Sequence, residues 1–236
     1  MRRSRTFWFA WAVALVAMAG FARLGLWQYH RMQEKQALLA DVARVLSHPA
    51  PIALAADVPA GMAWVEGDAK LDARTLLLDN QLRDGKPGVH VYCLATAGSA
   101  HRLVDLGWVA VKPDRTMPDV ACPAGPLHVR GLLTTLPSSG LRMGAPMQRI
   151  DAARWLMVRA DADAIASTLG VPVPARVVRL DPKAPVGWQR DLDILPNTLP
   201  PERHLGYAVQ WWALSLAVLV TALVLTFRKP RQKRTA

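Results

Sequence analysis

The residues best suited to chemistry lie together at the start of a long apolar run near the C-terminal end of the chain. His204 stands directly before this run, and aromatic and amide side chains follow it within two helical turns. A neutral imidazole above a rim of aromatic rings could hold a metal ion or a porphyrin iron. The same residue types also gather at membrane surfaces as simple anchors. The residues that follow the histidine are Gly206, Tyr207, Gln210, Trp211 and Trp212.

Helical spacing predicts which of these side chains could share a ligand. His204, Tyr207 and Trp211 stand at positions i, i+3 and i+7, so one ring could touch all three. His30 lies at a similar predicted depth after the other apolar segment, so both imidazoles could approach one porphyrin if the two helices pack. The alternative is that these groups reach only for lipid headgroups. Basic residues that could meet the porphyrin carboxylates are Arg23, Arg31 and Arg203.

Two apolar runs of membrane-spanning length position these residues. Residues 205–227 contain 23 residues without a charge, and as a helix they span roughly 34 Å, enough for a bilayer core of about 30 Å. Residues 7–27 form a second run that only Arg23 interrupts. A cleaved signal peptide is the alternative, because Ala17-Met18-Ala19 has the form of a cleavage site. The apolar character resumes at Leu24, beyond that site, which favours an uncleaved span.

The distribution of charge predicts how both spans are oriented. The net charge is +11, and the predicted tails, residues 1–6 and 228–236, carry eight basic residues and no acidic one. Short basic tails stay on the cytoplasmic side, so both termini are predicted to be cytoplasmic and residues 28–204 to lie on the far side. The high isoelectric point is therefore a sign of topology and predicts no nucleic-acid partner. Because the chain enters the first span almost at once, we expect a bacterial inner membrane and a periplasmic domain.

The central domain is predicted to be α+β with mainly antiparallel strands, which would allow its sheet to close toward a barrel. The first helix is expected to continue out of the membrane to residue 44 and to end at residues 48–51, which contain two prolines. Short β-compatible runs joined by glycine-containing turns predict a meander in the middle of the chain. Residues 161–169 predict a helix, and residues 137–146 a loop. The predicted strands are 64–70, 75–82, 89–96, 102–111, 127–136, 155–158 and 176–180.

Few residues suggest an enzyme. The chain contains no glycine-rich phosphate loop, no G-x-S-x-G and no H-E-x-x-H, so we predict no catalytic activity. The remaining histidines fall in predicted turns or strands and are expected to be surface residues. They are His48, His90, His101 and His128.

The sulfur-containing residues leave two further questions open. Cys93 and Cys122 are the only cysteines and stand 29 residues apart, so a disulfide is possible but cannot be deduced from the sequence. No C-x-x-C motif is present, so no thiolate metal site is predicted. Met143 and Met147 offer thioethers that suit Cu(I), but neither has a cysteine or histidine partner nearby in the sequence. A copper-delivery role is therefore the weakest of the functional alternatives.

Five short blocks stand in a fixed order along the chain. They are Leu24–Gln28 with Arg31 and Lys35; Leu78–Asn80 with Gly85, Pro87-Gly88 and Val91; Leu103–Val109; Val129–Gly131; and His204–Trp212. Together they resemble the Surfeit locus protein 1 family of membrane assembly factors for haem–copper cytochrome c oxidase. The third block departs from the family pattern, because Leu106 stands where an arginine usually precedes Gly107-Trp108, which puts any role of that arginine in doubt.

The resemblance implies a role in the maturation of oxidase subunit I, in which the protein receives or protects haem a. It implies contacts with that subunit, with haem a synthase as a further candidate partner, and no catalysis by the protein itself. His204 would be the iron ligand, although His30 occupies a position that the family motif leaves free. The rival hypothesis is a membrane scaffold without haem that stabilises assembly intermediates through protein contacts. The predicted cofactor-binding residues are His204, Tyr207, Trp211, His30 and Arg203.

Overall fold

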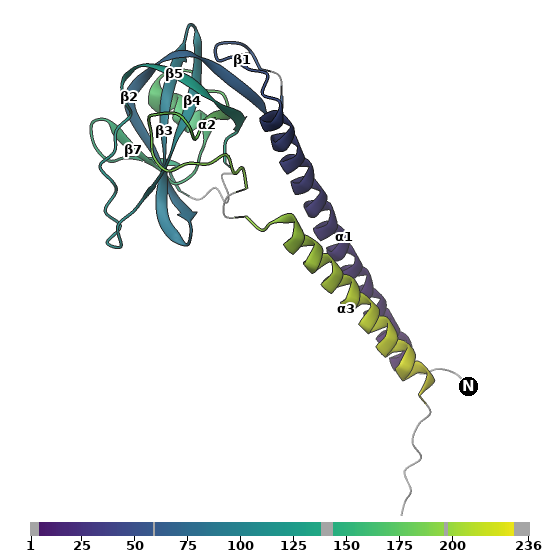
Figure 1. Ribbon diagram of the computed structural model, residues 1–236. Coiled ribbons are helices and arrows are strands. Elements are labelled where there is room, and N and C mark those ends of the chain that lie inside the picture. The colour runs from purple at the N-terminus through teal and green to yellow at the C-terminus, as the bar shows by residue number, and fades with distance from the viewer. Residues whose placement is uncertain (1–4, 59, 138–143, 196–197, 229–236) are drawn as a thin grey trace, which may run out of the picture. The chain divides into compact units, whose positions relative to one another are not determined.

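The computed structural model describes residues 5–58, 60–137, 144–195 and 198–228, and divides the chain into two compact units. One unit consists of Met1–Ala40 with Thr198–Ala236, and the other of Asp41–Asn197. The first contains two long helices and the second a mixed sheet with one short helix (Figure 1). The predicted class, an α+β protein with two flanking apolar helices, is confirmed.

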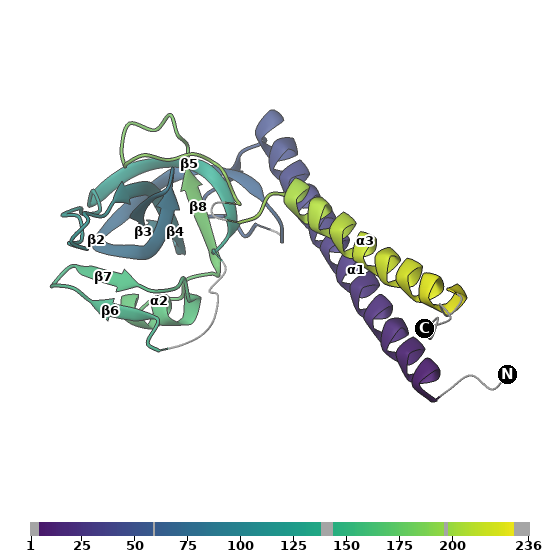
Figure 2. The same ribbon diagram turned by 90° about the horizontal axis from the view of Figure 1, so that it is seen from below.

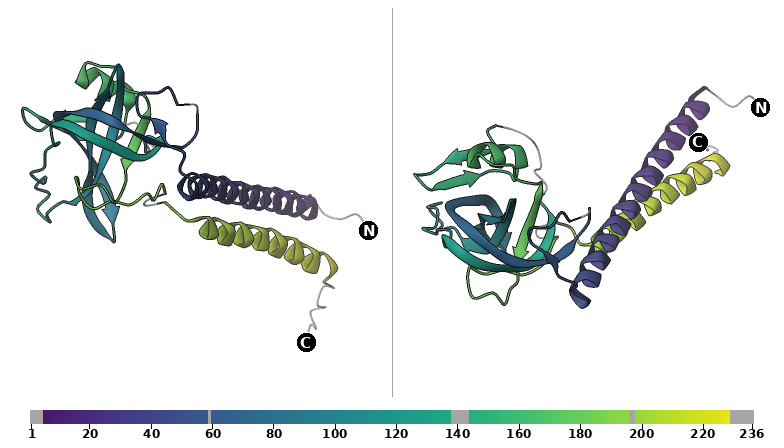
Figure 3. Two further views of the ribbon diagram at one scale, coloured as in Figure 1. Left: turned by 45° about the horizontal axis from the view of Figure 1, so that its top comes forward. Right: turned by 90° about the horizontal axis from the view of Figure 1, so that it is seen from above.

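The two long helices are both long and apolar enough to cross a membrane. Helix α1 spans Arg5–Ser47 and helix α3 spans Pro201–Phe227. Contacts between them pair early residues of α1 with late residues of α3, as Trp11 with Thr226 and Met18 with Ser215 show. The helices therefore form an antiparallel hairpin, and they lie side by side in every view (Figure 3). The prediction that the first helix extends beyond the apolar run and ends before Pro49 is confirmed.

Five strands of the second unit pair in a closed ring. The order β3-β4-β8-β5-β2 is completed by a further pairing of β2 with β3, which makes a small barrel (Figure 3). The predicted closure of the sheet toward a barrel is therefore confirmed. The bounds of the ring strands are β2 Ala63–Arg83, β3 Lys86–Ala97, β4 Ala100–Ala110, β5 Gly125–Thr135 and β8 Arg176–Leu180.

Smaller elements extend this barrel. Strand β1, Ile52–Ala53, pairs with the first part of β2. Strand β7, Arg154–Met157, pairs with the second part of β2, and β6, Met147–Arg149, pairs with β7. Helix α2, Ala162–Leu169, lies beside these two strands (Figure 2). Asp161 caps its N-terminus, where its side chain accepts a hydrogen bond from the Ala164 amide, and Gly170 ends it in the left-handed conformation.

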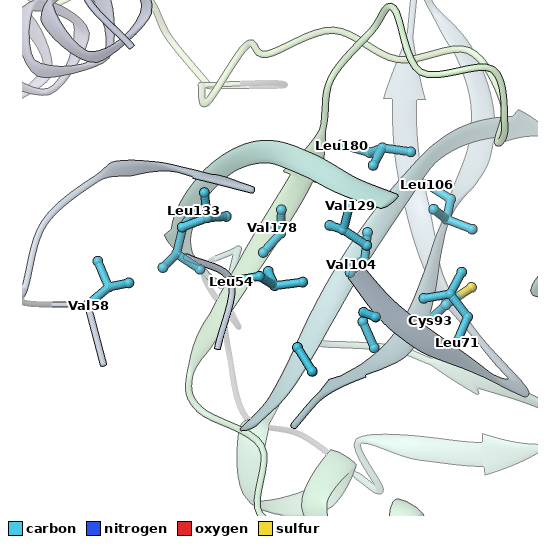
Figure 4. Packing of buried hydrophobic residues seen from close by; sticks show 14 of the residues in the cluster. Leu54, Val58, Leu71, Cys93, Val104, Leu106, Val129, Leu133, Val178 and Leu180 are labelled. Carbon is cyan, nitrogen blue, oxygen red and sulfur yellow. The ribbon is translucent and has the colours of Figure 1, made fainter. Parts of the chain in front are cut away.

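Alternation along the ring strands separates the two largest clusters of buried residues. Cys93, Val104 and Val178 point into the barrel with other small and branched side chains (Figure 4). Their neighbours Leu94, Leu103 and Val177 point outward and pack beneath α2 and β7. Strand β3 is therefore buried on both faces, which explains its nearly continuous apolar sequence.

The strand predictions need three corrections. The runs 64–70 and 75–82 form one strand, because the Asp72–Arg74 ion pair holds the polar interruption as an irregularity inside β2. The meander covers only β2, β3 and β4, while β4–β8 and β2–β7 pair in parallel. Strands β1 and β6 were not predicted, since two or three residues are too few for a periodic pattern. Part of the predicted loop, residues 138–143, lies outside the described residues.

Candidate functional site

His204 lies in the interface between the two long helices. It occupies the first turn of α3, and only 7% of its surface is exposed. Its ring nitrogen Nδ1 lies 2.7 Å from the side-chain oxygen Oε1 of Gln28 on α1. A glutamine oxygen can only accept a hydrogen bond, so this geometry makes Nδ1 the donor. The contact fixes the orientation of the ring relative to α1.

The second ring nitrogen of His204 is the distinctive feature of the site. Nε2 is buried and has no hydrogen-bond partner among the described residues. With the proton on Nδ1, Nε2 carries a lone pair, and this is the form in which histidine binds metals. Buried polar atoms are nearly always paired, so an unpaired one asks for an explanation.

His30 does not lie beside this ring. It is exposed, whereas Gln28 makes the contact with His204. Two residues along a helix correspond to a rotation of about 200°, so Gln28 and His30 point to opposite sides of α1. The geometric idea that two imidazoles approach one porphyrin therefore has no support from the arrangement of the hairpin.

The other predicted residues surround His204 to different degrees. Trp211 is half-buried and stacks on Phe21, with 5.6 Å between the ring centroids. Tyr207 points more outward and is 39% exposed, and Arg203 is also exposed. Of the predicted set, His204 and Trp211 thus share the helix–helix face, and Tyr207 and Arg203 lie at its margin.

Residues that the sequence blocks contained, but that were not predicted as site residues, complete this interface. Gly25 lies against the indole of Trp212, and no β-carbon would fit there. One turn later on α1 comes Gln28, and one turn after that the buried Met32. Lys35 donates a hydrogen bond to the Leu199 carbonyl oxygen. The first and last family-like blocks are therefore two halves of one contact surface.

Positive charge accompanies the buried histidine. Lys35 and Arg31 lie close enough for their charges to act on the His204 ring. Arg31 also forms an exposed ion pair with Glu34 at 2.7 Å. A ligand that carries carboxylates would therefore meet cationic groups near the imidazole.

A cavity lies between the two helices at the end away from His204. Its volume is about 380 Å³, and its lining is mostly apolar. The Trp11 indole, which lines it, donates a hydrogen bond of 3.0 Å to Thr226. Within the described part of the chain, no titratable side chain lines it, so this lining offers no polar chemistry comparable with that at His204.

The middle blocks serve the architecture of the barrel. The second and third blocks each contain a β-bulge, at Asp79-Asn80 in β2 and at Leu106-Gly107 in β4. Gly107 has a φ of +118°, and an added β-carbon would lie 2.8 Å from the Trp188 carbonyl oxygen. The bulge thereby lets the segment containing Trp188 and Gln189 bond to β4. In this chain Leu106 is fully buried in the barrel core, so the departure from the family pattern places an apolar side chain there.

Trp108 follows the second bulge and closes over the second block. Its ring lies against Gly88, and its indole nitrogen donates to the Gln81 carbonyl oxygen at 2.8 Å. Trp108 is buried, since only 6% of it is exposed. Gly131 of the fourth block likewise has no room for a β-carbon, because the Arg179 carbonyl oxygen of β8 lies against it.

One histidine prediction was wrong. His90 is buried, and its Nδ1 lies 3.0 Å from the carboxylate of Asp105. Burial raises the pKa of Asp105, but the charge of His90 and its hydrogen bond, with help from Arg179, outweigh that effect and lower the pKa. Because the strand is buried on both faces, it has no alternating pattern that could have shown that His90 is buried.

The sulfur-containing residues have mainly structural roles. Cys93 and Cys122 form a disulfide, with 5.8 Å between their α-carbons. The Met147 sulfur accepts a hydrogen bond from the Thr168 hydroxyl at 3.7 Å, and Met143 lies outside the described residues. Among the residues that the structure describes, no group of three histidine, cysteine or acidic side chains could hold a metal ion. The copper alternative therefore gains no support.

The fold and the site define a class: a small β-barrel protein with a flanking hairpin of two membrane-length helices and a buried histidine between them. The sequence model of the SURF1 family matches residues 15–216. The chain therefore belongs to the SURF1 family, which is a family of cytochrome c oxidase assembly factors rather than of enzymes. A search of individual curated proteins gave no match.

Proposed function

We propose that this protein assists the assembly of cytochrome c oxidase by holding haem a at His204 during the maturation of subunit I. The observation that carries the proposal is the buried, unpaired Nε2 of His204. Bound haem would supply an iron centre, and a neutral imidazole such as that of His204 is a known protein ligand for haem iron. Trp211 and Tyr207 would offer apolar contact to the porphyrin, and Arg31, Lys35 and Arg203 would pair with its carboxylates.

The donor chemistry fits haem, but the burial of Nε2 sets a condition. An iron cannot reach an atom without exposed surface, so the side chains around His204 must move before haem binds. The hairpin permits such movement because few polar contacts hold the helices together. Those among the described residues include His204–Gln28, Ser215–Met18 and Trp11–Thr226.

The same contacts favour one alternative, a scaffold without haem. In this hypothesis His204 and Gln28 act only as a polar clasp that aligns the two helices. Polar side chains commonly join helices in membranes, so the clasp alone would account for both residues. The protein would then stabilise assembly intermediates through contacts of its hairpin or its barrel with partner subunits.

Haem retention by the purified protein separates these hypotheses. The full-length protein would be expressed in cells that make haem a and solubilised in mild detergent, and its haem content would be measured by absorbance. His204→Ala should lose most of the haem and alter the visible spectrum. His30→Ala, which removes an exposed imidazole from the facing helix, is the matched control and should retain it. Equal haem content in wild type and His204→Ala, at equal membrane levels, would contradict the haem-ligand role and favour the scaffold hypothesis.

The proposed location is a bacterial inner membrane, with both termini in the cytoplasm and the barrel in the periplasm. The basic tails support this orientation, although residues 1–4 and 229–236 lie outside the described residues. The Cys93–Cys122 disulfide is compatible with an oxidising compartment. Reporter fusions at both ends would test it, and a periplasmic C-terminus would contradict it.

The proposed partners are oxidase subunit I and haem a synthase, and no nucleic acid. The family supports contact with oxidase components in general. Photo-crosslinkers at exposed hairpin positions near the site, such as Tyr207, would identify the neighbours in the membrane. Crosslinks to subunit I that disappear when haem synthesis is blocked would indicate that the contact with this partner depends on haem.

A further inference from the structure

We infer that Gln28 is the positioning residue of His204: its amide oxygen holds the imidazole in the tautomer that leaves Nε2 free to bind a metal. This inference rests on the proposed function, because only a metal ligand needs that tautomer. Gln28 does not touch the iron in this account. It acts through the ring of His204.

The hydrogen-bonding chemistry of the pair selects the tautomer. Gln28 Oε1 lies 2.7 Å from His204 Nδ1, and an amide oxygen accepts but never donates. If the proton sat on Nε2, two acceptors would face each other at Nδ1, and a buried N–H would remain unpaired. Unpaired buried N–H groups are rarer than unpaired acceptors. The arrangement therefore favours a proton on Nδ1 and a lone pair on Nε2.

The type of residue at position 28 also matters. Metal-binding histidines usually donate their other ring N–H to a carboxylate, a backbone carbonyl or water, which orients the ring. The glutamine amide provides the same acceptor without a charge. It therefore orients His204 without adding a negative charge to an interface between apolar helices.

The helix interface holds Gln28 firmly in place. Gly25, three residues earlier on α1, packs against the Trp212 indole. Met32, four residues later, is buried. Gln28 thus stands between two fixed contact points on the same face of α1, and its reach toward His204 is set by the packing of the hairpin. Loss of the amide should free the ring while leaving these flanking contacts intact.

A spectroscopic measurement tests the tautomer without haem. Full-length protein with ¹⁵N-labelled histidine would be studied in lipid nanodiscs, and the His204 signals would be identified by their absence in His204→Ala. Wild type should show the proton on Nδ1, and Gln28→Leu, which has similar size but no acceptor, should lose that preference. Gln28→Glu restores an acceptor and should restore it. Gln33→Leu, at an exposed position of the same helix, is the control and should leave the spectrum unchanged.

Haem titration then tests whether the tautomer of His204 affects haem binding at the proposed site. Iron protoporphyrin IX would be added to each variant, and binding would be followed by absorbance. Loss of an outer hydrogen-bond partner typically lowers metal affinity about 10–100-fold, and we expect a loss in that range for Gln28→Leu and none for Gln33→Leu. Tryptophan emission would check that the hairpin remains packed in each variant.

The outcomes distinguish haem binding by His204 from positioning of His204 by Gln28. Haem binding that does not depend on His204 overturns the proposed function, and the positioning role falls with it. Haem binding that requires His204 but is equal in Gln28→Leu and Gln33→Leu overturns the positioning role alone. A proton on Nε2 in the wild-type protein also overturns the positioning role, whatever the haem titration shows.

Discussion

The helix hairpin and the barrel use their family-like residues in different ways. In the barrel, glycines, bulges and Trp108 fit backbone against backbone, and the buried atoms without a hydrogen-bond partner, such as Asp79 Oδ1 and Arg179 Nε, belong to side chains that make other ion pairs. In the hairpin, most apolar side chains point outward, and one buried polar atom at His204 is left without a partner among the described residues. The comparison teaches that the glycines and bulges of the barrel blocks serve backbone packing, whereas the hairpin blocks bury an imidazole nitrogen whose lone pair could bind a metal.

The largest effect is expected for the tryptophan in the barrel. Trp108→Ala removes a buried ring and an indole hydrogen bond, so we expect a loss of about 3–5 kcal/mol in the free energy of unfolding. Urea denaturation of the detergent-solubilised chain, followed by circular dichroism, would measure it. Trp155→Ala, which removes a half-buried ring beside Arg149, should cost clearly less. An unchanged midpoint for Trp108→Ala would contradict an architectural role for its block.

The disulfide should come next. Cys93 and Cys122 are separated by 29 residues and join β3 to the segment before β5. Loss of a native disulfide typically costs about 2–5 kcal/mol, and we expect the Cys93→Ala/Cys122→Ala variant to unfold at a correspondingly lower urea concentration. Reductant should destabilise the wild type and leave this variant unaffected. If reductant does not change the urea midpoint of the wild type, the disulfide is either absent or does not contribute to stability.

A smaller effect is expected in the hairpin. Hydrogen bonds between membrane helices contribute about 0.6 kcal/mol on average, so the coupling between Gln28→Leu and His204→Leu should be of that size. A double-mutant cycle would measure it from hairpin unfolding in mixed micelles, with energy transfer between labels on exposed positions of α1 and α3. A coupling of several kcal/mol would show that Gln28 and His204 mainly stabilise the hairpin. These residues would then have a structural role like that of the barrel blocks.

The smallest effect concerns an exposed histidine of the barrel. Hydrogen bonds from His128 to Asp68 and then to Glu66 raise the pKa of its imidazole above the ordinary value. A histidine whose pKa is raised in the folded state adds to the free energy of unfolding. This contribution is fully present below the unfolded-state pKa of about 6.5, and it is lost as the pH rises through the folded-state pKa. The group is exposed, so solvent screens most of the effect.

The pH dependence of the stability of a His128 variant tests the contribution of its contacts with Asp68 and Glu66. His128→Asn should lose stability relative to wild type at about pH 6, and the difference should shrink toward about pH 9. His48→Asn alters an exposed histidine without a carboxylate contact and provides the control. A difference that stays constant across this range would show that the charge of His128 does not matter.

The sequence by itself determined those features that depend on short stretches of chain. The apolar runs set the two long helices, Asp161 and Gly170 bounded α2, and alternation located the ring strands to within a few residues. Each of these signals acts through local hydrogen bonding and periodic burial, which a window of neighbouring residues contains. The histidine before the second run could be found in the same way, since its position depends only on the boundary of that run.

Only the tertiary structure decided which distant residues meet. The parallel pairing of β4 with β8, the contact of His90 with Asp105 and the Cys93–Cys122 bond all join segments whose separation no local pattern encodes. The choice of Gln28 over His30 as the partner of His204 depends on which face of α1 meets α3. Because each residue turns a helix by about 100°, two positions of sequence separate a contact from solvent, and the packing of Gly25 against Trp212 fixes that rotation.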